Sequence, residues 1–130
     1  MSDWAAIAAQ AKAAREVQCS AGGHTFTLLV PTRHECVRIA HKSDSQGNLA
    51  LLQRALLEDA IVGWQGPRLR DLFPGTLESG NPEADAPLEW AAQGVPLLLD
   101  AQPGWEDTLN EALVDALNDR HARAKAAAGN

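Results

Sequence analysis

The amino-acid sequence predicts an α+β fold that is mostly helical, with one N-terminal β-hairpin followed by a small packed set of helices. Two observations support this fold class. Apolar and polar residues alternate on both sides of a Gly-Gly pair early in the chain, which is typical of a hairpin. Later segments repeat apolar residues every three or four positions, as amphipathic helices do.

The length and charge indicate a single domain over residues 1–130, because a chain of this size can bury one core without disulfides or structural metals. A formal net charge of −6 argues against a nucleic-acid partner, since phosphate contacts require a basic surface. The sequence shows neither a signal peptide nor an apolar run of membrane-spanning length. No membrane partner is therefore expected, and the predicted location is the cytoplasm.

Residues 1–15 are predicted to form a peripheral helix. The segment "DWAAIAAQAKAAR" is rich in alanine, and Ser2 or Asp3 can cap its first turn. Trp4 and Ile7 are its only large apolar side chains. We therefore expect this helix to pack weakly, or to become ordered with a partner.

The segments "EVQC" and "HTFTLLV" alternate apolar and polar residues around "SAGG", and this pattern predicts the hairpin. Pro31 then keeps the residue before it extended. Thr32 and Glu35 have the spacing of a capping box, in which each side chain binds the other residue's backbone amide. A short helix is expected to begin at this point.

A longer helix is predicted from residue 48 to residue 62. Its apolar stripe is continuous, and Arg54 and Glu58 form an ion pair of i, i+4 spacing on the polar side. The helix runs into "IVGWQG". We expect Gly63 to end it in a left-handed conformation, Trp64 to fold back into the core, and Gly66 to begin a turn.

Residues 67–89 are rich in glycine, proline and acidic residues and predict a long flexible loop, which in a compact domain is usually functional or disordered. The last helix is predicted from residue 102 onward. Acidic residues lie in its first turn and basic residues near its end, which complements the helix dipole. Residues 120–130 are expected to form a frayed C-terminal tail.

No set of residues predicts catalysis, a metal or a cofactor. Cysteines and histidines gather early in the chain, but without the close pairs of a zinc site. Neither a nucleophile elbow nor a phosphate loop is present, and "GWQG" lacks the basic residues of a nucleic-acid clamp. Glu111, Asp115 and Asp119 recur at helical spacing without a histidine in register, so we expect an acidic stripe that faces solvent or a partner.

Several short motifs occur in a particular order. An extended segment ends in "VPT" before a capping glutamate, and an amphipathic helix closes as "AIVGWQG". The segments "APLEW" and "VPLLLDAQPGW" then precede the final helix. This order resembles the small tail assembly chaperones of long-tailed bacteriophages and prophages, over roughly residues 25–120. The acidic loop over residues 68–87 and the N-terminal helix depart from the family pattern.

The resemblance implies a non-enzymatic protein of the host bacterial cytoplasm. Such chaperones bind the phage tape-measure protein, help to recruit tail-tube protein, and are generally absent from the finished virion. In many phages a ribosomal frameshift adds a second domain to some copies. Self-association is permitted by the sequence but not required.

Partner binding is predicted at tryptophans and leucines beside flexible stretches or on the last helix, because tryptophan is favoured at binding hot spots and the client surface is apolar. The candidate residues are Trp4, Leu88, Trp90, Trp105, Leu109 and Leu113. Each tryptophan has an alternative place in the protein's own core, since tryptophan is highly buried on average.

Two other functions remain open at the level of sequence. One is a structural virion protein, such as a tail completion, connector or minor tail protein. The other is a small metal-binding enzyme that uses the cluster of Cys19, His24, His34, Cys36 and His41.

Overall fold

The computed structural model describes residues 1–43, 47–76 and 82–129, and over these residues the fold is α+β and mostly helical, as predicted. In chain order the elements are α1 (Trp4–Ala13), β1 (Glu16–Ala21), β2 (His24–Leu29), α2 (Arg33–Lys42), α3 (Leu49–Ala60), β3 (Ile61–Gln65), the 3₁₀ turn η1 (Leu69–Leu72), α4 (Gly94–Ala101) and α5 (Pro103–Ala128).

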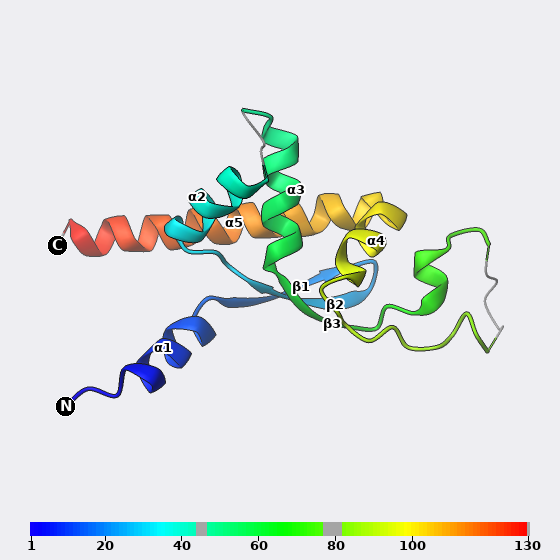
Figure 1. Cartoon of the computed structure of the whole chain (residues 1–130), viewed down its shortest axis with the longest axis horizontal. Coiled ribbons are helices and arrows are strands. Elements are labelled where there is room, and N and C mark those ends of the chain that lie inside the picture. The colour runs from blue at the N-terminus through cyan, green and yellow to red at the C-terminus, as the bar shows by residue number, and fades with distance from the viewer. Residues whose placement is uncertain (44–46, 77–81, 130) are drawn as a thin grey trace.

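α5 runs along the length of the molecule and organises the other elements around it (Figure 1). It packs against β1, α3 and α4, while α2 packs against α3 and α4 packs against η1. α1 projects away from this body, on the same side as the C-terminal end of α5 (Figure 1).

The predicted hairpin is confirmed. β1 and β2 pair antiparallel from Glu16 opposite Leu29 to Ala21 opposite His24. Gly22 and Gly23 connect the strands with φ angles of 59° and 80°, the conformation of a two-residue hairpin turn that glycine adopts without strain. The indole ring of Trp105 lies directly over Gly22, where it occupies the space of a β-carbon, whereas Gly23 faces open space.

The segment after α3 is a strand, so the prediction of a helix that ends at Gly63 is wrong. α3 ends at Ala60, and β3 pairs antiparallel with β2 to complete a sheet of order β1-β2-β3. Gly63 is not left-handed, because it lies opposite Thr27 within the sheet. Gly66, at φ 111°, makes the predicted turn.

A β-bulge explains why this strand has the sequence pattern of a helix. Gly63 pairs with Thr27, but Ile61 pairs with Leu28, so Val62 is an extra residue in β3. The bulge turns Ile61 and Trp64 to the same face, and both are buried. A spacing of three residues between buried side chains is typical of a helix, although here it arises in a strand.

The core lies between one face of the sheet and the helices α3, α4 and α5. Trp64 is buried in it, as predicted, although it belongs to a strand. The Phe26 ring meets Trp64 and Trp105 edge to face, with ring centroids 6.2 Å and 6.1 Å apart. The other core residues are Ala21, Leu28, Leu57, Ala60, Ile61, Val95, Leu98, Leu99, Leu109 and Leu113.

Much of the segment predicted to be a flexible loop, residues 67–89, is ordered. The amides of Leu69 and Arg70 donate hydrogen bonds to the carbonyls of Ala86 and Ala84, each over 3.0 Å. Ala84 is fully buried. The two arms of the segment therefore support each other, while residues 77–81 lie outside the described residues.

The predicted frayed tail over residues 120–130 is also corrected, because α5 continues as a helix to Ala128. Residue 130 lies outside the described residues. From residue 118 to residue 128 every helical residue is exposed. The second half of α5 therefore extends beyond the core that its first half covers.

Arg54 on α3 joins three helices through one guanidinium group. It donates to Glu58 at 3.0 Å, as its spacing predicts, and also to Glu106 at 2.9 Å and Asp100 at 2.7 Å. A further hydrogen bond reaches the carbonyl of Pro96. Burial acts to lower the pKa of Arg54, but the hydrogen bonds and charges of Asp100 and Glu106 outweigh it and raise the pKa. The guanidinium therefore stays charged and fixes α3 against α4 and α5.

Gly22→Ala is expected to destabilise the protein more than Gly23→Ala. Both variants place a side chain at a left-handed position, which costs about 1 kcal/mol each. Only Gly22→Ala also overlaps the Trp105 ring, and overpacking of this kind costs about 1–3 kcal/mol more. Urea unfolding of both variants measures the difference. Equal losses of stability would mean that Trp105 does not rest on the turn.

Arg54→Met is expected to lower the free energy of unfolding by about 1–2 kcal/mol, because three carboxylates lose their shared partner. The matched control is Arg123→Met, which removes one exposed pair with Asp119 and should cost less than about 0.5 kcal/mol. Thermal and urea unfolding at low and high salt provide the measurement. Similar losses for the two variants would contradict a joining role for Arg54.

Candidate partner-binding surfaces

Leu109 and Leu113 belong to the core, so their prediction as partner-binding residues is wrong. Their side chains are 0% and 1% exposed. They lie in the half of α5 that covers the sheet and α3. The sheet and α3 therefore cover the apolar face of α5 at which the sequence predicts a partner. Both residues stabilise the fold and are not available for binding.

Leu88 and Trp105 also make their main contacts within the protein. Each is half-buried and packs against the core. The carbonyl of Leu88 accepts a 2.7 Å hydrogen bond from the indole of Trp64. The ring of Trp105 lies edge to face on His24, with centroids 5.1 Å apart. Any binding at these two residues would involve only their exposed edges.

Trp4 and Trp90 are the predicted partner-binding residues that the structure leaves exposed. Trp4 is 72% exposed and Trp90 is 39% exposed. The indole of Trp90 donates a 3.2 Å hydrogen bond to the carbonyl of Ile61, so one edge is held while part of the ring faces solvent. An anchored aromatic ring loses little conformational entropy on binding, which favours it as a contact residue.

α1 is an apolar helix with little packing against the rest of the described chain. The Asp3 side chain caps it by accepting a 3.2 Å hydrogen bond from the Ala6 amide. None of its residues is buried, and Ile7 is 41% exposed beside the more exposed Trp4. An isolated helix of this length is only marginally stable in water. Its exposed apolar side chains therefore form a candidate binding surface.

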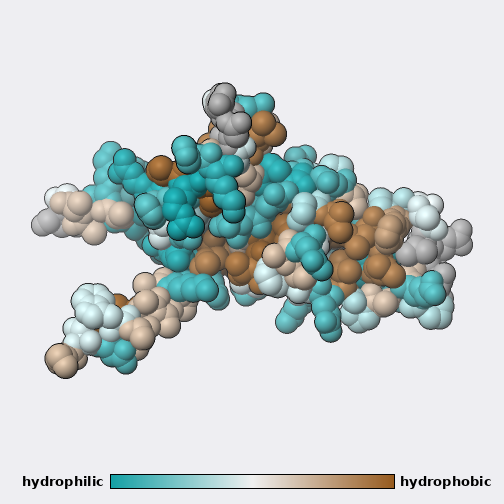
Figure 2. Space-filling view, viewed as in Figure 1, coloured by the Kyte–Doolittle hydropathy of each residue, from teal (hydrophilic) through white to brown (hydrophobic). Residues whose placement is uncertain are grey.

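Other apolar residues are exposed that the sequence pattern does not single out. Leu97 on α4 is 60% exposed, and Phe73, directly after η1, is 48% exposed. α4 and η1 pack together. Figure 2 shows hydrophobic residues gathered over the part of the molecule where α4 lies. The run "PLLL" signals an apolar segment, but only the packing decides that its first leucine faces outward.

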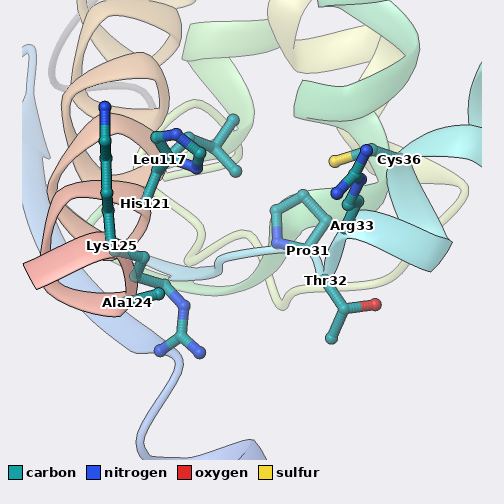
Figure 3. Close-up of a pocket in the computed structure, with 9 residues that line it drawn as sticks. Pro31, Thr32, Arg33, Cys36, Leu117, His121, Ala124 and Lys125 are labelled. Carbon is teal, nitrogen blue, oxygen red and sulfur yellow. The ribbon is translucent and has the colours of Figure 1, made fainter. Parts of the chain in front are cut away.

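A groove separates the start of α2 from the second half of α5, with a volume of about 820 Å³. In Figure 3 Pro31 and Cys36 lie on one side of this space, and Leu117 and His121 lie on the other. The remaining lining residues are Thr32, Arg33, Arg120, Ala124 and Lys125. We call this space the α2–α5 groove.

The α2 wall of the groove is held by the predicted capping box, which is confirmed. The Glu35 amide donates to the Thr32 hydroxyl at 3.1 Å, and the Thr32 amide donates to the Glu35 carboxylate at 3.0 Å. Arg15 binds the same carboxylate at 2.7 Å and the carbonyl of Val30 at 2.9 Å. Pro31, which is predicted to keep the residue before it extended, is buried. The start of α2 is therefore tied to the segment that follows α1.

These contacts shift two pKa values. The hydrogen bond from the Thr32 amide, together with the Arg15 charge, lowers the pKa of Glu35. Burial, assisted by the charge of Glu35, raises the pKa of the Cys36 thiol. Cys36 is therefore a neutral, half-buried side chain at neutral pH, and it contributes apolar surface to the groove.

The five cysteines and histidines considered for a metal site do not converge. Cys19 lies on β1 and Cys36 on α2, while His24 contacts Trp105 and lies 3.8 Å from an Asp71 oxygen. Over residues 1–43, 47–76 and 82–129, no three His, Cys, Asp or Glu side chains are close enough to hold a metal ion.

Comparisons of the chain with models of protein families, with curated proteins and with solved structures find no match. In the part of the chain that the structure describes, no helix has the length and apolar character needed to cross a lipid bilayer.

In a Glu35→Gln variant, acidification is expected to lower the free energy of unfolding less than it does in the wild type. The folded-state pKa of Glu35 is lowered, so its contribution is full above the ordinary value of 4.5 and disappears as the pH falls through the lowered pKa. The wild type should therefore lose more stability than the variant below this pH. Solvent screening keeps the difference under about 1 kcal/mol. Urea midpoints on both sides of the window measure it, and parallel pH profiles would contradict it.

Proposed function

We propose that this protein is a non-enzymatic tail assembly chaperone of a long-tailed bacteriophage or prophage, which binds tape-measure and tail-tube proteins in the host cytoplasm. The ordered motifs support this proposal. "VPT" follows β2 and its threonine caps α2, and "AIVGWQG" forms the junction of α3 and β3. "APLEW" contributes Leu88 and Trp90, which hydrogen-bond to the tryptophan and the first residue of β3.

The observation that supports a client-binding role, independently of the family resemblance, is the exposed helix α1. An assembly chaperone must cover apolar, helix-forming surface on its client until the client is assembled, and a complementary apolar surface is required for this. Trp4 and Ile7 provide such a surface on a helix that buries none of its own residues. Because α1 projects from the body, a client can contact it from several sides (Figure 1).

The test is co-expression of the tagged full chain with the tape-measure protein and the tail-tube protein encoded beside its gene. Replacing Trp4 and Ile7 together by alanine should weaken client binding by roughly tenfold or more, because each loses buried apolar area in the complex. Stability should not change, since neither side chain is buried in the free protein. Affinity capture and thermal unfolding provide the two measurements.

The matched control is Gln10→Ala with Lys12→Ala, which alters two exposed polar residues of the same helix. It should bind the client as the wild type does. If the wild type captures neither client, the chaperone proposal fails. Stoichiometric amounts of the chain in purified particles would instead favour a structural virion protein.

A further inference from the structure

We propose that the α2–α5 groove binds an acidic, helical segment with an apolar face from a partner protein. The inference rests on the proposed chaperone function, since it names the chemistry of one client segment. The groove would be a second binding site, separate from α1. At α1 the proposed contacts are the apolar side chains of Trp4 and Ile7, whereas the groove combines apolar surface with positive charge.

The groove has apolar walls on both sides. Pro31 and Cys36 line one side, and Leu117 and Ala124 line the other. Along α5 the lining residues are at positions 117, 120, 121, 124 and 125, which is the spacing of one helix face. A single face of α5 therefore lies open beside α2 (Figure 3). A second helix can lay its apolar side chains along such a face.

The charge of the groove opposes the charge of the protein as a whole. The chain has a formal net charge of −6 with its histidines counted as neutral, yet Arg33, Arg120 and Lys125, together with His121, line the groove and no acidic residue does so in the described part of the chain. Within that part, these four side chains make no ion pair or side-chain hydrogen bond. Arg123, two positions before Lys125, is by contrast paired with Asp119.

These basic side chains are available to an incoming carboxylate. They need not break an internal ion pair to bind it, so the partner's acidic residues gain contacts without a compensating loss in the protein. The positive charge also attracts an acidic segment and repels a basic one, which provides specificity in addition to the apolar contacts.

The second half of α5 has little tertiary packing to stabilise it as a helix. Its residues from 118 to 128 are all exposed. A helical extension of this length gains little from its own hydrogen bonds. Burial of its groove face by a second helix would stabilise it.

Two segments of this chain are alternative occupants. α1 is a poor match in charge, because it carries Lys12 and is followed by Arg15. The stripe of Glu111, Asp115 and Asp119 on a second copy matches in charge, but Val114 beside it is only 37% exposed. It offers few of the apolar side chains that the walls require, so we assign the groove to a different protein.

The experiment measures binding of a fluorescent synthetic peptide to the full chain by anisotropy. The peptide is a helix former with leucines on one face and glutamates on the other, and a control peptide has lysines in place of the glutamates. The wild type should bind the glutamate peptide at least roughly tenfold more tightly than the lysine peptide, and more weakly as salt rises. Failure to prefer the glutamate peptide overturns the proposal.

Charge reversals locate the binding. Arg33→Glu with Lys125→Glu should weaken binding of the glutamate peptide by roughly tenfold or more. Arg38→Glu with Arg123→Glu changes the net charge equally on the same two helices but away from the groove, and should have a much smaller effect. Equal losses from the two variants would mean that general charge attraction binds the peptide, and would overturn the proposal.

Alkylation of Cys36 supplies a second readout in a Cys19→Ser background. The glutamate peptide should slow alkylation, because Cys36 lines the groove. Unchanged alkylation at saturating peptide overturns the proposal. Sedimentation of the wild type without peptide tests the second copy: self-association that the Arg33→Glu, Lys125→Glu variant abolishes would assign the groove to the acidic stripe instead.

The result is separable from that of the chaperone proposal. If the chain captures tape-measure protein but does not prefer the glutamate peptide, the groove inference fails and the function stands. If the peptide binds in the groove but neither client is captured, the function fails and the groove remains a binding site for acidic helices.

Discussion

The position of Phe26 is the constraint on which the rest of the structure depends. This residue lies on the central strand and is 1% exposed, between Trp64 of β3 and Trp105 of α5. A three-stranded sheet is stable only when one of its faces is covered. Here the contacts of Phe26 with Trp64 and Trp105 place α5 over the buried face. Trp105 in turn occupies the space that Gly22 leaves open above the hairpin turn. The start of α5 is thus held by the turn and by the centre of the sheet at once.

Because α5 is one continuous helix, the packing of its first half also sets the direction of its second half. Leu109 and Leu113 bury the first half against the sheet and α3, and the guanidinium of Arg54 fixes the neighbouring helices. Beyond Leu117 the helix leaves the core and becomes one wall of the α2–α5 groove. The opposite wall is held by the Thr32 and Glu35 capping box, which Arg15 ties to the chain beside β1. The α2 wall is therefore fixed within the fold, and the direction of the α5 wall is set by the buried first half of that helix.

The two proposed binding surfaces differ in chemistry. α1 presents Trp4 and Ile7 on a helix that buries none of its residues, so any gain from binding there would come from burial of apolar area. The groove joins apolar walls with basic side chains in a chain whose net charge is −6. An assembly factor that holds two different regions of a client, or two clients, requires surfaces that differ in this way, because identical surfaces would not discriminate between them. Linking two weak sites also raises the overall affinity while each contact remains reversible.

The sequence by itself determined the features that depend on neighbours along the chain. These are the hairpin with its Gly-Gly turn, the capping box at Thr32 and Glu35, the amphipathic helices and the ion pair of Arg54 with Glu58. Only the tertiary structure decided that residues 61–65 form the strand β3, because the bulge at Val62 gives buried residues the spacing of a helix. It also decided that the sheet, and no partner, covers Leu109 and Leu113, since an apolar stripe does not reveal what lies against it. The groove could not be read from the sequence at all: its walls come from residues 31–36 and 117–125, which lie far apart in the chain and are brought together only by the packing of α2 and α5 around α3.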